Sequence, residues 1–219
     1  MNKNIAQQGR SMIEMLGVLA IIGVLSVGGL VGYSKAMERY RVNETINQIV
    51  YMVGNIHSLF KTQRDYSDLL DMNSAIVNLA TSTARIRIIG DKAQIFPASI
   101  INNDYKNVFG GRISFFRNCG RYELGDKKSF GFLYYGIPQE ACIELVTKDW
   151  NNMQDGFLGM EVEGSRNDYN VGTTFQGNCT SEYRAGAGLF CPKDFPLSPE
   201  IAVTVCDKAN DNSVQWHFY

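Results

Sequence analysis

The chain has 219 residues, a formal net charge of −1 and 45% hydrophobic residues. This length allows one globular domain of about 140 to 150 residues behind a long helix. Because lysine and arginine are not in excess, the composition gives no indication that nucleic acid is a partner.

The N-terminal residues MNKNIAQQG form a short polar leader, and Gly9, Arg10 and Glu14 mark the approach to an apolar run. From Met15 to Ser34, twenty residues carry no charge. With a rise of about 1.5 Å per residue, this run forms a helix of about 30 Å, the hydrocarbon thickness of a bilayer. The sequence therefore predicts a membrane segment with Glu14 at its edge, where a carboxylate needs a partner.

A secretory signal peptide fits this N-terminus less well. Such a peptide has a small-residue cleavage site after its apolar stretch. Ser26, Val27 and Gly28 could form that site, but the apolar run continues through Leu30 and Val31. An acidic residue at the entry to the apolar stretch is also unusual.

Beyond the apolar run, apolar residues recur at helical steps of three and four, as at Ile46, Ile49, Val53 and Ile56. This pattern predicts one continuous helix from about residue 11 to 60. The alternative is a plain membrane anchor followed by a separate helix, which the absence of a clear break disfavours.

Two glycines of the apolar run, Gly28 and Gly32, lie four residues apart. Small residues at this spacing allow membrane helices to approach closely, which predicts a packing face. A membrane helix that simply tolerates glycine is an equal alternative. A further hypothesis is that the helix can unwind locally at Gly28 and Gly29.

The remaining sequence predicts an α+β head, in which a helix packs across an antiparallel β-sheet. The expected regions are a leader at 1–9, a long N-terminal helix at 10–60 and a globular head at 61–219. The expected helices of the head are 66–81 and 138–150. The expected strands are 85–89, 112–116, 130–135, 156–162, 201–205 and 214–218, with a turn at GDKK (125–128).

No catalytic or metal-binding pattern is present in the sequence. His57 and His217 are not spaced as metal ligands, and HExxH, CxxC, GxSxG and P-loop patterns are absent. We therefore expect no enzyme activity, no metal site and no cofactor. Six aromatic residues are expected mainly in the core, although an adhesive surface stays open: Phe115, Phe116, Tyr134, Tyr135, Trp150 and Trp216.

The stretch GRSMIEMLGVLAIIGVLS resembles the processing signature of type IV pilins and their pseudopilin relatives, and the resemblance covers about the first 60 residues. It implies that a prepilin peptidase cleaves between Gly9 and Arg10. In the family the new amine is methylated, and for this chain the resemblance leaves methylation open. The family usually has an apolar residue where this chain has Arg10. The resemblance also implies that Glu14 is the assembly charge, paired with the new amine of a neighbouring subunit.

The stretches FLYYGIPQEACIELV and VCDKANDNSVQWHFY resemble the head of type IVb pilins. All five cysteines follow residue 118, on the side expected in the periplasm, where disulfides form. The cysteines alone allow fifteen arrangements with one unpaired. The resemblance suggests a disulfide between Cys142 and Cys206, after which Cys179 and Cys191 could pair locally. Cys119 would then be free, as a buried thiol or an intersubunit crosslink.

Membership in this family implies a pilus subunit with a disulfide-bounded C-terminal region. Such a subunit is first anchored in the bacterial inner membrane with its head in the periplasm. It then polymerises with further copies of itself into an extracellular filament for adhesion, conjugation or motility. The implied partners are the prepilin peptidase, the assembly platform and its ATPase, and an outer-membrane secretin. A minor pilin or a type II secretion pseudopilin is an alternative, and a membrane-anchored periplasmic protein is a second one.

Overall fold

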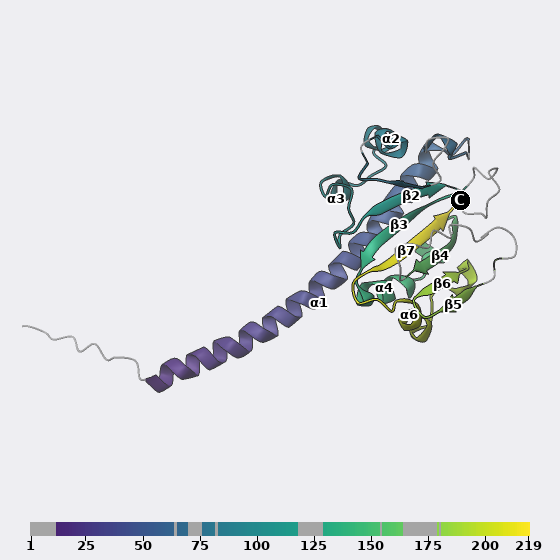
Figure 1. Cartoon of the computed structure of the whole chain (residues 1–219). Helices are drawn as coiled ribbons and strands as arrows, with labels where there is room; N and C mark the ends of the chain where they lie inside the picture. Colours follow the sequence, from purple (N-terminus) through teal and green to yellow (C-terminus); the bar gives the residue numbers. More distant parts are fainter. Residues whose placement is uncertain are drawn as a thin grey trace, which may run out of the picture. The chain divides into compact units, whose positions relative to one another are not determined.

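The computed structural model describes residues 12–63, 65–69, 76–81, 83–117, 129–153, 155–163, 179 and 181–219 (Figure 1). The chain divides into two compact units, Met1–Tyr40 and Arg41–Tyr219. The second unit, called the head, contains a seven-stranded sheet.

Helix α1 (Met12–Leu59) is continuous over 48 residues, which confirms the long helix predicted from the sequence. Its N-terminal part carries five glycines but no proline, and every residue from 12 to 36 is exposed. In a globular protein a helix gains most of its stability by packing an apolar face. This segment therefore has an apolar surface that the described residues do not cover.

The C-terminal part of α1 belongs to the head and buries one face. Its buried residues recur at helical spacing: Val42, Thr45, Gln48, Ile49, Met52, Val53 and Ile56. Burial of each large apolar side chain contributes about 1.5 to 3 kcal/mol. The predicted amphipathic pattern is confirmed here.

The sheet is antiparallel throughout and has the order β1-β2-β3-β7-β4-β6-β5. The strands are β1 (Ile76–Asn78), β2 (Ile113–Arg117), β3 (Phe130–Ile137), β4 (Phe157–Glu163), β5 (Glu182–Arg184), β6 (Ala187–Phe190) and β7 (Asn212–Phe218). The last strand of the chain lies in the middle of the sheet, between β3 and β4 (Figure 1). The predicted strands at 112–116, 130–135, 156–162 and 214–218 are confirmed.

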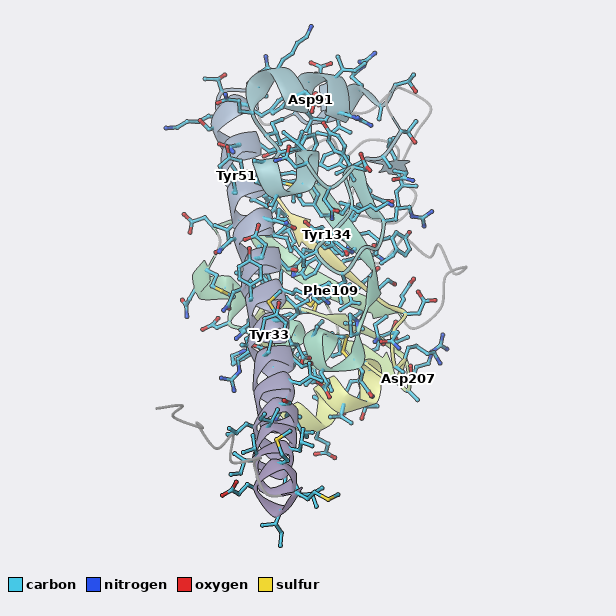
Figure 2. All side chains as sticks on the ribbon, turned by 90° about the vertical axis from the view of Figure 1, so that its left-hand side faces the viewer. Tyr33, Tyr51, Asp91, Phe109, Tyr134 and Asp207 are labelled. Carbon is cyan, nitrogen blue, oxygen red and sulfur yellow. A yellow bond between two sulfur atoms is a disulfide. The ribbon has the colours of Figure 1, made fainter. Side chains whose placement is uncertain are left out.

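The two faces of the sheet bury different clusters. On one face, Val214, Trp216 and Phe218 of β7 join the main core, which includes the buried face of α1. Tyr134 of β3 lies in this core and donates a hydrogen bond to Gln48 Oε1 of α1 at 3.3 Å (Figure 2). A smaller cluster contains Phe116, Leu133, Tyr135, Leu158 and Leu189.

The remaining helices are short. They are η1 (Ser67–Leu69), α2 (Arg85–Ala93), α3 (Ala98–Ile101), α4 (Gln139–Val146), α5 (Trp150–Met153), η2 (Pro192–Asp194) and α6 (Pro199–Val205). Cys142 of α4, together with Ala202 and Val205 of α6, is buried in the main core.

The predicted strand at 85–89 is wrong, because these residues begin helix α2. The alternation of Arg85, Ile86, Arg87 and Ile88 suggested a two-sided strand. In the structure Ile86 is buried and Ile89 packs against the core, whereas Ile88 is 48% exposed. The inward positions are therefore three residues apart, which is helical spacing.

The predicted strand at 201–205 is also wrong, because these residues lie in helix α6. Ser198 is its N-cap, and its hydroxyl accepts a hydrogen bond from the Ile201 N–H at 3.4 Å. Pro199 follows at the first helical turn, a position where its missing N–H has no cost. This cap outweighs the β-branched residues of the segment.

Two predicted helices also differ from the structure. Within the predicted helix at 66–81, the described residues form the turn η1 and strand β1. The predicted helix at 138–150 ends at Val146, and α5 begins separately at Trp150. Pro138 is the N-cap of α4 rather than its first helical residue. The predicted GDKK turn lies outside the described residues, and β5 and β6 were not predicted.

Candidate functional site

The exposed apolar part of α1 is the first candidate site. Its large side chains are more than half exposed, with Ile13 at 77% and Val24 at 74%. Among the described residues, α1 is the one helix long and apolar enough to cross a membrane. An exposed apolar helix of this length can contact lipid or the helices of other molecules.

Glu14 lies in the first turn of α1 and is exposed. A carboxylate in the first turn of a helix is stabilised by the helix dipole. The predicted cleavage residues, Gly9 and Arg10, lie outside the described residues.

Gly28 and Gly32 occupy one side of the exposed part of α1, since residues four apart share a helix face. A Cβ atom added at either position would meet no atom within 4 Å. Nothing inside the described part of the subunit therefore requires glycine at these two positions.

Two disulfides stabilise the head. Cys142 of α4 is bonded to Cys206, the residue after α6, and Cys179 is bonded to Cys191, the residue before η2. These are the two pairs expected from the sequence. Cys119 lies outside the described residues.

Neither histidine belongs to a metal cluster, and the described residues contain no group of three or more potential metal ligands. His57 of α1 makes a short hydrogen bond to the carbonyl oxygen of Tyr219. His217 lies in β7 with its ring 5.0 Å from that of Phe116, and burial lowers the pKa of its imidazole to about 3. A neutral buried imidazole is consistent with a structural role.

A buried polar row that was not predicted from the sequence lies next to the smaller cluster. Ser213, Gln215 and His217 alternate along β7 with the apolar residues of the main core, and Glu161 of β4 pairs with Gln215. The period-two alternation in NSVQWHF was the available signal. The aromatic side chains expected in the core are buried, including Phe115, Trp150 and Trp216.

Comparison with known proteins gives relatives over the whole chain, although no protein-family model matches it. The chain is 23% identical over 220 residues to the major structural subunit of the bundle-forming pilus of Escherichia coli O127:H6, covering 100% of this chain and 96% of the relative. The corresponding subunit of Escherichia coli O111:H− is 24% identical with the same coverage.

Among solved structures, the chain resembles TcpA, a type IV pilin from Vibrio cholerae El Tor biotype. The TM-score is 0.50 at 15% sequence identity, and the match covers 80% of this chain and 99% of that one. This likeness shows the fold.

The chain has an apolar N-terminal helix, an antiparallel sheet and two disulfides in its C-terminal region. It also has relatives that match it from end to end. Together these findings show that the chain has the type IV pilin fold and that the relatives it matches end to end are major structural subunits of a pilus.

Proposed function

We propose that this chain is processed by a prepilin peptidase and polymerises through α1 into an extracellular pilus. The observation that carries the proposal is the exposed apolar segment at 12–36, which no other described part of the chain covers. A bilayer covers such a surface before assembly, and the helices of neighbouring subunits cover it in a filament.

Cleavage between Gly9 and Arg10 creates a free amine four residues before Glu14. In an apolar bundle a carboxylate is tolerated when a cation neutralises it. The amine of Arg10 in one subunit is the proposed partner of Glu14 in the next, which fixes the axial register of the two helices. The Arg10 guanidinium is a second cation able to pair with Glu14.

Gly28 and Gly32 are the proposed contact face for a neighbouring helix. Their open surroundings in the subunit support this role, because the space that glycine leaves there is available to another chain. In this scheme residues 1–9 are removed, 10–60 form the stalk and 61–219 form most of the head.

The relatives favour a major subunit over a minor pilin or a pseudopilin, because both are named as major structural subunits of a pilus and both match this chain end to end. The proposed partners are further copies of the chain, the prepilin peptidase, the assembly platform with its ATPase, and an outer-membrane secretin. The precursor is placed in the inner membrane with its head in the periplasm.

Blocking the cleavage tests this function. In the Gly9→Val variant we expect the full-length chain to stay in the inner membrane and filaments to be absent from sheared cell-surface material. The matched control is Gln8→Val, which changes the neighbouring leader residue and should leave filaments at the wild-type amount. Abundant filaments of uncleaved Gly9→Val subunits would refute the proposal, as would a membrane-anchored wild-type protein that never enters a filament.

A further inference from the structure

Among the residues that the structure describes, strand β5 (Glu182–Arg184) forms one edge of the sheet and pairs with β6 alone. All three of its residues are exposed, and Figure 1 shows the strand at the outer side of the sheet. Within the described part of the chain, β5 makes no backbone hydrogen bond other than those to β6. An open edge of this kind is a template for pairing with another strand.

The turn after β5 determines which backbone groups lie at the open edge. Arg184 pairs with Ala187 across the two-residue turn formed by Ala185 and Gly186, where Gly186 has a φ of 74°. The residues that flank such a turn exchange both hydrogen bonds. Because bonded and non-bonded pairs alternate, Tyr183 directs its N–H and C=O away from β6.

The side chains of β5 are complementary to those of a second β5. When two copies pair antiparallel around Tyr183, Glu182 of each copy lies opposite Arg184 of the other, and opposite charges across strands stabilise a pair. Centring the pair on Glu182 places two carboxylates opposite each other, and centring it on Arg184 places two guanidinium groups opposite each other. Only one antiparallel register therefore satisfies the charges.

Tyr183, the residue at the centre of this register, has its side chain held in place within the subunit by Phe190. Tyr183 is 53% exposed, and its ring stacks on Phe190 with 6.1 Å between centroids and 30° between planes. Phe190 is buried in the main core. A ring held in this way loses less conformational freedom when a second ring packs beside it.

We propose that β5 is a self-recognition strand through which two copies of this chain pair about a twofold axis. Each Tyr183 N–H donates to the Tyr183 carbonyl of the other copy, and two ion pairs between Glu182 and Arg184 flank this centre. The inference rests on the proposed polymerisation. Subunits within one helical filament make heterologous contacts, so a twofold contact joins two filaments that run in opposite directions.

A single contact of this size is weak, since it consists of two backbone hydrogen bonds and two exposed ion pairs. Salt screens such charges with a Debye length of about 8 Å at 0.15 M ionic strength. Two filaments, however, present many copies to each other, and every contact after the first forms at a high effective concentration. Pairing is therefore expected between filaments rather than between single subunits, and added salt should weaken it.

Charge reversal on β5 tests the proposal in filaments of the full chain. Low-speed centrifugation collects laterally associated filaments, and high-speed centrifugation collects the single ones. The Glu182→Arg and Arg184→Glu variants each place like charges opposite each other, and we expect each to lower the low-speed fraction at least tenfold at unchanged total filament. The double variant restores complementarity, as does mixing filaments of the two single variants, and both should recover the wild-type fraction within twofold.

The matched controls are Glu200→Arg and Lys193→Glu, which make the same changes in charge at exposed positions outside β5. They should associate like wild type. Single reversals that still associate normally, or a double variant that stays dispersed, would overturn the self-recognition strand while leaving polymerisation intact. If the wild-type chain forms no filaments at all, the proposed function fails first and this inference fails with it.

Discussion

Glu14 is the only charged residue between Met12 and Ser34. Its carboxylate is therefore the single formal charge in the apolar part of α1. Removing one partner of a buried ion pair typically costs about 3 to 5 kcal/mol, because the other charge stays buried without compensation. We expect Glu14→Ala subunits to insert into the membrane at the wild-type amount but to form few filaments. Quantification of the chain in membrane and sheared-filament fractions measures both.

Two variants separate charge from shape at this position. Glu14→Gln keeps the size of the side chain and should assemble as poorly as Glu14→Ala, while Lys35→Ala removes a charge elsewhere on the exposed part of α1 and should assemble normally. Wild-type filament levels in Glu14→Gln would show that the charge of residue 14 has no role in assembly.

His217 makes the stability of the head dependent on pH. Burial lowers its pKa from about 6.5 in the unfolded chain to about 3 in the folded one. The unfolded chain therefore binds more protons than the folded chain between these two pH values. The contribution of His217 to the free energy of unfolding is complete above pH 6.5 and is lost as the pH decreases toward 3. The contribution of this group is about 1.4 kcal/mol per pH unit in that window.

Denaturant unfolding of the detergent-solubilised chain at several pH values measures this slope. His217→Phe should have a smaller slope between pH 6 and pH 4. Gln215→Leu, which removes a neighbouring buried polar group that does not titrate, should keep the wild-type slope. An unchanged slope in His217→Phe would mean that other groups cause the acid sensitivity.

Among the elements, the two disulfides close loops of different lengths, with sequence separations of 64 and 12 residues. In the loop-closure model the longer loop contributes about 4 kcal/mol and the shorter one about 3 kcal/mol. We expect Cys142→Ser/Cys206→Ser to lower the free energy of unfolding more than Cys179→Ser/Cys191→Ser does. Denaturant titration of both double variants compares them, and a reversed order would contradict the loop-closure explanation.

The role of the helix face formed by Gly28 and Gly32 in filament formation can be tested without changing the stability of the subunit. Because an added Cβ meets nothing within 4 Å at either position, Gly28→Leu and Gly32→Leu should leave the amount of membrane-inserted subunit unchanged. If this face packs against a neighbour, the same variants should form at least tenfold fewer filaments.

The control for this face is Gly23→Leu. At 3.6 residues per turn, Gly23 lies roughly 140° around the helix from Gly28, and an added Cβ there also meets nothing within 4 Å. It should assemble near the wild-type level. Equal losses at Gly23 and Gly28 would mean that the whole helix, and not one face, needs glycine.

The sequence predicts the elements whose pattern is long or strictly periodic. Helix α1 and strands β2, β3, β4 and β7 were all predicted from their apolar runs. Errors occurred where short segments fit two periods, as at 85–89, or where a cap overrode β-branched residues, as at 201–205. Strands β5 and β6 have only three and four residues, too few to establish a period of two. Their pairing within the sheet holds them in place.

The candidate sites also divide into features that the sequence predicts and features that it does not. The exposed apolar part of α1 could be predicted because its signal is local composition. The alternation in NSVQWHF signals the polar residues Gln215 and His217, but the burial of that row and the charge pattern on β5 depend on which strands become neighbours. Strand order comes from contacts between distant segments, which periodicity alone does not reveal.

At the scale of the whole molecule, the chain combines a helix with an exposed apolar surface and a head with its own buried core. The head buries its apolar residues and is crosslinked twice, so it can fold before assembly. The exposed part of α1 can satisfy its apolar surface in lipid first and among other copies later. The proposed function, a membrane precursor that later becomes a filament subunit, rests on this division.

The N-terminal mass of the chain in purified filaments tests this account most directly. Peptide mass spectrometry should show a mature chain that begins at Arg10, with or without a methyl group on its amine. A chain that keeps residues 1–9, or one that begins after about residue 28, would contradict the account, because Glu14 would then have no new amine to meet in the neighbouring subunit.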